Sequence, residues 1–537
     1  MNCYREEIKA YLDRNERHRN SLFKRGFLIT DHQGLRMDEY PFYGLWSKHR
    51  FGTFSIYIQQ EENVHIFCDG EYSIALIGHA WDPYNDCIDE NVIIKDLLRL
   101  YAANEDSFLD KVDSLTGIFV IVVEHKGSLN VVQDCSGPMS VYFGKVNGCA
   151  VMSSSPQLAG DVFGLERDRD IERLVDTKGY KRGSGFLPGN KSPFSELKRL
   201  GCNTKLHYDG NSFGISRIFP REKRNEAVSA AEKKEVVEQI YRLMSKNVEL
   251  ALKKWERMSL SLSGGMDSRT EFACASEHLD DIFVFSYATK PSEKIDADAA
   301  AEICRQINVP HHLVDIPQSS DEIEDYKLLD MIIEHNTSYM CKIHPNEKRK
   351  FLWFENQDLF TAEFKGDVSE IARAYADRKY YKVKLPRVLS PRHFTIVQGR
   401  YFFEPWALHY SDRAFREFMN ETGLVDDILG YSMHDLFYWE VKTGSWAATV
   451  YNMQSYMHQI VMVYNNRDLM KLFLQFPQAE RRCDIPHKRV IERANPKLAQ
   501  VDSQIKDSYF GMKRMLAETA YYYLYTRLNT MGKNRAH

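Results

Sequence analysis

A short glycine turn within residues 260–279, between a strand-like run and a helix-like run, constrains the fold more than any other feature. The sequence there is LSLSGGMDSRTEFACASEHL. Residues 257–262 alternate as a β-strand does, and Phe272, Ala273 and Ala275 share one face of an expected helix. A strand, a tight turn and a helix direct backbone N–H groups at one point, where phosphate oxygens bind readily. The stretch therefore predicts a phosphate site.

The length and composition of the chain indicate a soluble protein with more than one domain. A chain of 537 residues is too long for one compact core, so we expect two or more domains. Hydrophobic residues make up 43% and charged residues 27%, which is typical of soluble globular proteins. The balance of 71 Lys and Arg against 75 Asp and Glu argues against a nucleic-acid-binding or membrane-surface protein.

Targeting and redox signals favour the cytoplasm. The charged amino end lacks the apolar segment of a signal peptide, and no apolar run approaches the length of a bilayer span. The ten cysteines are scattered, without a CxxC pair or a Cys/His cluster at metal-binding spacing. We therefore expect a reduced, cytoplasmic chain with no structural zinc, no membrane association and no nucleic-acid partner.

The apolar pattern changes near residue 220. Before that point the chain consists mostly of β-rich runs broken by Gly, Asn and Asp, with one helical pattern over 90–105. Residues 220–228 are polar and typical of a linker. Ser229 and Glu232 then form a capping box at the start of a long helical pattern. We therefore predict one domain over 1–220 and a second over 221–537.

The second half alternates strands and helices. The expected elements are strands over 257–262, 281–290 and 310–316, with a helix over 296–309 between the last two. This order predicts a parallel sheet with crossover helices. Residues 405–480 and 505–530 are expected to be mostly helical and rich in aromatic residues. In a parallel sheet, ligands lie at the carboxyl ends of the strands, which is where the glycine turn falls.

The residues of the turn suit a nucleotide phosphate. Gly264 and Gly265 permit backbone conformations and close approaches that side chains would block. Ser263 and Ser268 add hydroxyl groups, and Asp267 beside a phosphate implies a Mg²⁺ ion between them. The turn differs from the G-x-x-x-x-G-K-[ST] loop of kinases and from G-x-G-x-x-G.

The turn matches S-G-G-x-D-S, the signature of pyrophosphate-loop enzymes that cleave ATP between its α and β phosphates. A β-rich first half followed by this domain resembles the asparagine synthetase family, including its β-lactam-forming, lasso-peptide-cyclising and polysaccharide-cluster relatives. The segments that carry the resemblance outside the turn are 113–143, 196–210, "FKGDVSEIARAY" (364–375) and "PHKRVIERANPKL" (486–498). The resemblance covers nearly the whole chain, but outside the turn it is one of pattern more than of identity.

The resemblance implies a fold and a reaction. The fold would be α/β: an Ntn-hydrolase-like α+β sandwich domain, then a parallel-sheet α/β synthetase domain with a helical C-terminal part. In the implied reaction, a carboxylate attacks the α-phosphorus of ATP, forming an acyl-adenylate and pyrophosphate, and a nitrogen nucleophile then displaces AMP. ATP and Mg²⁺ would be required. The partners would be a small-molecule or peptide carboxylic acid and ammonia or an amine, with a homodimer as one possible assembly.

The resemblance also implies roles for individual residues. The residues implied to hold ATP are Leu262, Ser263, Gly264, Gly265, Asp267, Ser268, Tyr287 and Gly366. Lys488 would lie over the phosphates and stabilise developing charge, although a solvated surface lysine is the alternative. Glu440, on a helical stretch near the expected substrate, is a candidate base for the incoming amine.

The second phosphate segment departs from the family pattern G-A-D-E. Ser369 stands where the family has a metal-binding aspartate, so Asp267 would share Mg²⁺ with Asp367 or Glu370. An ordinary helix start, with Ser369 as N-cap and Glu370 in the first turn, explains the same residues equally well.

The first half departs further. Glutamine-using members have an N-terminal cysteine as nucleophile, whereas this chain begins Met1-Asn2-Cys3. The family's N-G-E-I-Y-N segment appears as residues 77–83 without its asparagine and glutamate. We interpret the first half as a glutaminase-like scaffold without glutaminase activity. A pseudoenzyme scaffold, or another pyrophosphate-loop enzyme of the tRNA-modifying or NAD synthetase type, remains as an alternative for the whole chain.

Overall fold

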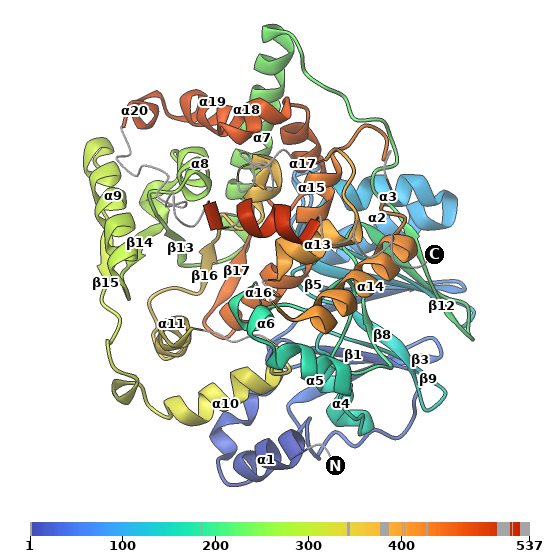
Figure 1. Ribbon diagram of the computed structural model, residues 1–537. Coiled ribbons are helices and arrows are strands. Elements are labelled where there is room, and N and C mark those ends of the chain that lie inside the picture. Colours follow the sequence, from blue (N-terminus) through green and yellow to red (C-terminus); the bar gives the residue numbers. More distant parts are fainter. Residues whose placement is uncertain are drawn as a thin grey trace.

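The computed structural model contains three β-sheets in two halves (Figure 1). It describes residues 3–183, 185–340, 344–375, 378, 386–399, 401, 403–425, 428–501, 516–517 and 519–526. Most of the helical segment expected over 505–530 lies outside the described residues, and its described part, 519–526, is helical.

The first half is built on two antiparallel six-stranded sheets. The first has the order β10-β8-β9-β1-β3-β2 and the second β12-β11-β7-β6-β5-β4. The strands of the first are β1 (Phe27–Thr30), β2 (Trp46–Phe51), β3 (Phe54–Gln59), β8 (Tyr142–Val146), β9 (Cys149–Ser153) and β10 (Lys198–Arg199). Those of the second are β4 (Val64–Asp69), β5 (Tyr72–Trp81), β6 (Thr116–His125), β7 (Ser128–Gln133), β11 (Thr204–Tyr208) and β12 (Phe213–Arg217).

Alternation along the strands places a hydrophobic core between these sheets. Ile56 and Ile58 of β3 share a cluster with Ile77 of β5 and Val120 of β6, whereas Tyr57 belongs to a separate cluster on the opposite face of its sheet. This period of two is the expected geometry of a strand buried on both faces.

Helices cover the two outer faces. The helices of this half are α1 (Cys3–Leu12), α2 (Glu90–Ala103), α3 (Glu105–Ser114), α4 (Pro156–Phe163), α5 (Arg169–Asp176) and α6 (Lys178–Arg182). Helices α2 and α3 pack on the second sheet, and α1 and α4 pack on the first. The helix expected over 90–105 is confirmed as α2; Asn104 ends it and caps α3, a further helix that was not predicted. The resulting α-β-β-α layers confirm the predicted α+β sandwich of the first half.

The second half contains a five-stranded parallel sheet of order β15-β14-β13-β16-β17. Its strands are β13 (Met258–Ser261), β14 (Phe283–Tyr287), β15 (His312–Val314), β16 (Ala362–Phe364) and β17 (Gln459–Val461). The three strands expected from the sequence are confirmed as β13, β14 and β15. β16 and β17 are short and were not predicted as strands.

Helices surround this sheet and form most of the rest of the chain (Figure 1). The helices up to β16 are α7 (Ala230–Lys254), α8 (Met266–Cys274), α9 (Pro291–Ile307), α10 (Tyr326–Asn336) and α11 (Pro345–Glu355). Those that follow are α13 (Pro391–Gln398), α14 (Pro405–Thr422), α15 (Met433–Phe437), α16 (Ala448–Gln454), α17 (Arg467–Leu474), α18 (Gln478–Arg482), α19 (Ile485–Ala494) and α20 (Pro496–Ala499). The expected capping box of Ser229 and Glu232 begins α7.

The two halves share one core. The largest hydrophobic cluster runs from the space between the first two sheets to the parallel sheet and its helices. Buried polar groups also cross the boundary: Trp81 Nε1 donates to Asn247 Oδ1 at 3.0 Å, and Arg467 pairs with Asp113 at 2.7 Å. The division near residue 220 stays a prediction, because this packing does not separate the halves.

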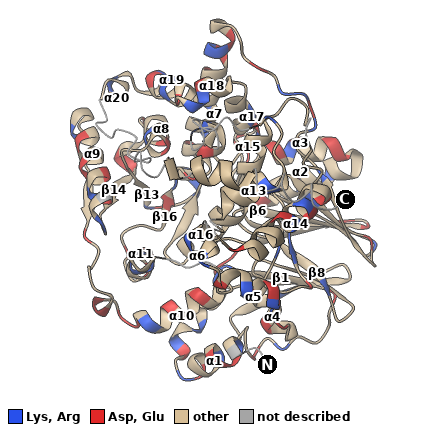
Figure 2. Cartoon of the chain, viewed as in Figure 1, with Lys and Arg blue, Asp and Glu red and all other residues tan. Residues whose placement is uncertain are grey.

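The surface charge and the helix lengths agree with the composition. Basic and acidic residues are interspersed over the helices of both halves (Figure 2). Within the described ranges, the structure contains no helix that is both long enough and apolar enough to span a membrane.

Candidate functional site

The glycine turn lies where the parallel sheet was expected to present a ligand site. Residues 262–265 connect the carboxyl end of β13 to α8, between the neighbouring strands β14 and β16. Gly366, just after β16, packs on the first turn of α8. A Cβ atom at Gly366 would lie 3.1 Å from both the carbonyl carbon of Asp267 and the backbone nitrogen of Ser268. This close approach requires glycine and holds the two predicted phosphate segments together.

The turn is closed by its own serines. The N–H of Ser263 donates to Ser268 Oγ at 3.2 Å, the N–H of Gly265 donates to Ser263 Oγ at 3.1 Å, and the two hydroxyl oxygens are 2.9 Å apart. Gly265 has φ −67° and ψ 159°, which any residue can adopt. The expected unusual backbone conformation is therefore wrong at Gly265. A side chain there would instead meet Ser263 Oγ, 3.1 Å from an ideal Cβ.

The N-terminus of α8 is available to an anion. Among the side chains that the structure describes, none caps this helix at Gly265. The first-turn N–H groups of a helix lack partners within it and carry the positive end of its dipole. An anion bound here would receive these N–H groups, as the sequence predicted.

Both oxygens of the Asp267 carboxylate are already engaged. Ser369 Oγ donates to Oδ1 at 2.7 Å, and Arg373 Nη1 donates to Oδ2 at 2.5 Å. Arg373 is held in turn by Asp484, through its Nε at 2.8 Å and its Nη2 at 3.2 Å. The Arg373 guanidinium places a positive charge against Oδ2 that repels a divalent cation, so the residues around Asp267 do not fit the predicted Mg²⁺ ion in this arrangement.

Ser369 belongs to this network and is not a helix cap. The residue before its short 3-10 turn is Val368, whose φ of 69° is unusual for a β-branched residue. The N-cap interpretation of Ser369 is therefore wrong. Its hydroxyl donates to Asp267 and lies 3.0 Å from Nε2 of the fully buried His487. His487 must donate to Ser369, because the hydroxyl proton is used on Asp267.

Further carboxylates crowd the same place. Burial, followed by the charges of Asp267 and Asp367, raises the pKa of Glu370 to about 7. Burial is also the main cause that raises the pKa of Asp367, and of Glu271, whose two oxygens are buried without a hydrogen bond. No three His, Cys, Asp or Glu side chains in the described part of the chain are arranged to hold a metal ion. Metal binding by Asp367 and Glu370 stays a prediction.

The buried lysines of the site are not the predicted one. Lys488 is exposed, and its Nζ donates to the carbonyl of Cys483 at 3.0 Å. Lys365, only 8% exposed, pairs with Glu363 and donates to Ser261 Oγ at 3.2 Å at the end of β13. The surface-lysine alternative thus describes Lys488 in this structure. Lys365 directly follows the three-residue strand β16, and its position after a strand of the parallel sheet was the signal that sequence reasoning missed.

The two residues predicted to flank adenosine lie on adjoining strand ends. The N–H of Leu262 donates to the carbonyl of Phe285 at 2.9 Å, which aligns the end of β13 with β14. The hydroxyl of Tyr287, at the end of β14, accepts from Lys350 Nζ at 3.1 Å. Lys350 is 7% exposed and is a second buried cation that was not predicted.

Glu440 joins the two halves. Its carboxylate is 1% exposed and accepts from Arg217 Nη1 at 2.6 Å and from Nη2 at 2.9 Å. Asn203 also donates to it at 3.2 Å. A carboxylate committed to a buried bidentate pair is a poor acceptor for a substrate proton, so this contact disfavours Glu440 as the base.

The segment aligned with the family's glutamine site is filled by aromatic packing. His79 is buried near Trp81 and Trp255, with ring centroids 6.2 and 5.0 Å away, and accepts from Gln459 Nε2 at 3.2 Å. Cys3 begins α1, a helix on the outer face of the first sheet, and does not begin a strand. The interpretation of the first half as a scaffold without glutaminase activity stays a prediction.

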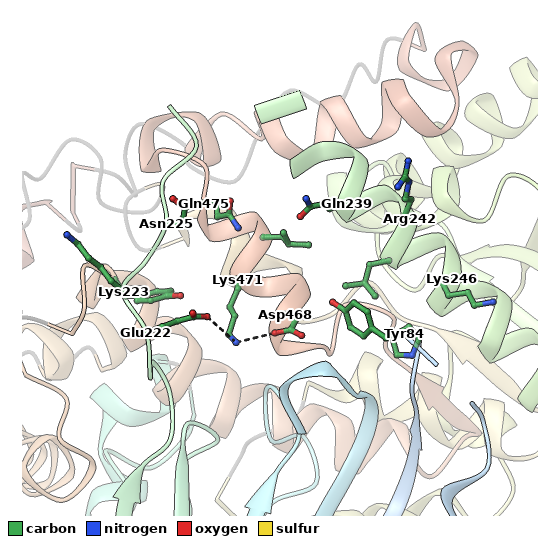
Figure 3. A pocket seen from close by; sticks show the side chains of 14 residues that line it. Tyr84, Glu222, Lys223, Asn225, Gln239, Arg242, Lys246, Asp468, Lys471 and Gln475 are labelled. Carbon is green, nitrogen blue, oxygen red and sulfur yellow. Dashed lines mark hydrogen bonds and ion pairs between the residues drawn. The ribbon is translucent and has the colours of Figure 1, made fainter. Parts of the chain in front are cut away.

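A separate pocket of about 790 Å³ lies between the two halves (Figure 3). The residues that line it come from the linker, α7, α17 and the residue after it, the loop after β5 and the segment before α15. Its central cation, Lys471, pairs with Asp468 at 3.1 Å and lies 3.8 Å from Glu222. None of the residues predicted to bind ATP lines this pocket.

Comparison with known proteins identifies one segment of the second half. Residues 239–339, from within α7 to just beyond α10, match the family model described as asparagine synthase. The predicted resemblance to the asparagine synthetase family is confirmed for this segment, and that family in general uses ATP.

Other similarities are shorter or weaker. A 61-residue stretch is 31% identical to part of 7-cyano-7-deazaguanine synthase from Clostridium botulinum (strain Loch Maree / Type A3). The matched stretch covers 11% of this chain and 28% of that protein. One solved structure, an allosteric regulatory enzyme of purine biosynthesis, has a TM-score of 0.23 and 12% identity over 57% of this chain and 62% of that one. Glutamine phosphoribosylpyrophosphate amidotransferase from B. subtilis has a TM-score of 0.22 and 10% identity over 70% of this chain and 75% of that one. Such scores are too low to support an argument about activity.

Proposed function

Taking residues 239–339 as an asparagine synthase-like segment, we propose that the chain is an ATP-dependent amide ligase. It would convert a substrate carboxylate to an acyl-adenylate and transfer the acyl group to ammonia or an amine. The observation that carries the proposal is the S-G-G-x-D-S turn at the carboxyl end of β13, against which Gly366 packs. The turn lies inside the matched segment.

Phosphate binding would use groups that the turn now satisfies internally. Rotation of the Ser263 and Ser268 hydroxyls would release the N–H groups of Ser263 and Gly265 toward phosphate oxygens. The N-terminus of α8 would add its own N–H groups. Lys365 and Lys350 would supply positive charge at the ends of β13 and β14, where charge on the leaving pyrophosphate builds up.

The reaction balances in two steps. A carboxylate oxygen of the substrate attacks the α-phosphorus, the bond from that phosphorus to the oxygen bridging to the β-phosphate breaks, and pyrophosphate leaves. The nitrogen nucleophile then attacks the acyl carbon, the carbon–oxygen bond to AMP breaks, and the nitrogen loses a proton. Holding both reactants in one orientation supplies a large part of the rate.

The nitrogen would come from outside the chain. The packing of His79 beside Trp81 and Trp255 and the position of Cys3 on an outer helix support a first half without glutaminase activity. Free ammonia, ammonia from a partner protein or the amine of a second substrate would then serve as nucleophile.

A pyrophosphate-release screen over amino acids, uronic acids and peptide acids tests this proposal. We expect one class of acid to yield AMP and pyrophosphate in equal amounts and to support exchange of labelled pyrophosphate into ATP. The Gly265→Asp variant, which places a carboxylate at the turn, should lose both signals. Formation of ADP, or no exchange with any acid while ATP binds, contradicts the proposal.

A binding or scaffold protein without turnover is the second candidate. Two contacts favour it: the turn is closed by Ser263 and Ser268, and Asp267 is paired with Arg373. Calorimetric titration with ATP in the presence of Mg²⁺ separates the candidates. Heat of binding with a dissociation constant below 1 mM, an order-of-magnitude limit for ordinary substrates, favours the ligase.

A further inference from the structure

The ion pair between Asp267 and Arg373 carries an inference beyond the reaction class. Asp267 lies in the first turn of α8, directly after the glycine turn, and Arg373 ends the 3-10 turn that follows Gly366. The pair therefore spans the two phosphate segments. Arg373 Nη1 donates a charge-assisted hydrogen bond to Oδ2 at 2.5 Å.

Arg373 is anchored on its other side. Its Nε and Nη2 donate to Asp484 at 2.8 and 3.2 Å, and Arg378 Nη1 donates to the same carboxylate at 2.8 and 3.0 Å. Asp484 is 8% exposed. The guanidinium is planar and always charged, so two carboxylates on different edges hold it in one orientation.

The surroundings of Arg373 are strongly acidic. Glu271, Asp367 and Glu370 all interact electrostatically with Asp267 or with one another. Polyphosphate would add more negative charge at this place. A fixed cation such as Arg373 lowers the electrostatic cost of placing a nucleotide beside these carboxyl groups.

Arg373 also keeps donors for a ligand. A guanidinium has five N–H groups, and three of them are used on Asp267 and Asp484. The two that remain are the second N–H groups of Nη1 and Nη2. Ser369 donates to the other Asp267 oxygen, so both oxygens have a protein donor, and the charge of Arg373 disfavours a metal ion beside them.

We propose that Arg373 replaces a divalent cation at Asp267, so that nucleotide binding by this chain does not need a metal ion there. The inference rests on the proposed function, because it assumes that the glycine turn binds ATP. The guanidinium supplies the positive charge between Asp267 and the phosphates. The Ser369 hydroxyl, in the position of the family's aspartate, holds Asp267 in place for it.

The test is a comparison of nucleotide binding with and without metal ions. The probe is the α,β-methylene analogue of ATP, which cannot be cleaved at the proposed bond. It is titrated calorimetrically into the full chain, either in EDTA or in about 5 mM Mg²⁺, which is enough to saturate ordinary magnesium sites. For the wild-type chain we expect dissociation constants that differ by less than about threefold. A loss of about tenfold or more in EDTA overturns the inference.

Arg373→Met should reverse this behaviour. Removing the guanidinium frees Asp267 Oδ2, so binding of the probe should weaken about tenfold in EDTA and recover when Mg²⁺ is added. Arg305→Met is the matched control, because Arg305 is an exposed arginine paired with Glu302 on α9. It should behave as the wild type does. Equal metal dependence of Arg373→Met and the wild type overturns the inference.

A direct metal readout covers the case in which Arg373→Met does not fold. Mn²⁺ binding followed by electron paramagnetic resonance, without nucleotide, should be weak in the wild type and at least about tenfold tighter in Arg373→Lys, whose ammonium cannot span Asp267 and Asp484 together. Tight Mn²⁺ binding by the wild type that is lost in Asp267→Asn overturns the inference. If the probe binds under neither condition, the proposed function fails and this inference fails with it.

Discussion

The segment aligned with the family's glutamine site, in the first half, and the glycine turn, in the second half, differ in the side chains that surround them. In the first half, His79 lies neutral beside Trp81 and Trp255, and burial lowers its pKa to about 3. In the second half, Asp267, Arg373 and Asp484 form a charged network beside a helix N-terminus that no described side chain caps. Buried charge is costly to maintain. Around Asp267 the second half keeps a charged network, whereas around His79 the first half has aromatic packing. This contrast points to a working site in the second half only.

The largest effect is expected from Gly366→Val. A side chain at Gly366 would press on the backbone of Asp267 and Ser268, each 3.1 Å from an ideal Cβ, and displace the glycine turn. We expect pyrophosphate exchange to fall by more than about 100-fold, since misplacing reacting groups by about 1 Å has effects of this size.

Gly214 in the first half is the matched control for that variant. An ideal Cβ there would meet no atom within 4 Å, so Gly214→Val should leave exchange and the melting temperature nearly unchanged. Equal losses in the two glycine variants would contradict the view that only the second half holds the site.

Replacing the buried Lys365 and the exposed Lys488 in turn tests which lysine belongs to the site. Lys365→Met removes the ammonium partner of Glu363, which is 1% exposed and keeps its contact with His458, and should lower the free energy of unfolding by about 3 kcal/mol. Lys488→Met should change it by less than about 0.5 kcal/mol, because Lys488 is exposed. Chemical denaturation of both variants measures the change in the free energy of unfolding.

Probe binding by the folded fraction then ranks the two lysines. Weaker binding in Lys488→Met than in Lys365→Met would restore Lys488 as the phosphate lysine.

The second half should lose stability as the pH rises through neutrality. The folded-state pKa of Glu370, about 7, is above its ordinary value, so the folded state holds the proton more tightly than the unfolded state. Its contribution is present below pH 4.5 and is lost toward pH 7, by at most about 3 kcal/mol. Glu370→Gln should therefore raise the melting temperature relative to the wild type at pH 8 and have little effect near pH 4.5. A constant difference across this range would show that Glu370 does not titrate as stated.

The stability of the first half should depend on pH in the opposite direction. Burial lowers the pKa of His79 from 6.5 to about 3, so the unfolded state binds the proton more readily and stability falls as the pH drops below 6.5. Between pH 6.5 and 5 the loss is about 2 kcal/mol. In His79→Gln the unfolding free energy should fall less steeply over that range. An unchanged slope would mean that His79 is not held neutral by its packing.

Sequence patterns identified the parts of this protein whose structure is local. The strand before the turn, the helix after it and the capping box of Ser229 and Glu232 depend on neighbours within a few residues, and each was predicted correctly. The short strands β16 and β17 were missed, because three residues carry too little periodicity to indicate a strand.

Contacts between residues far apart in the sequence could not be predicted from the same patterns. Nothing near Lys488 shows that its side chain lies on the surface while the neighbouring His487 is fully buried against Ser369. Glu440 likewise could not be assigned to Arg217, 223 positions away in the sequence.

The amino-acid sequence alone indicated a strand-rich first half, a parallel sheet in the second half and the position of the glycine turn, because glycine spacing and apolar periodicity act over short distances. Which charges meet at that turn was decided by tertiary structure. Arg373, Asp484 and Lys365 reach the site from separate segments, and their pairing depends on how the parallel sheet and its helices pack. Coulomb interactions fall slowly with distance in a buried site, so charge balance is a property of the assembled molecule.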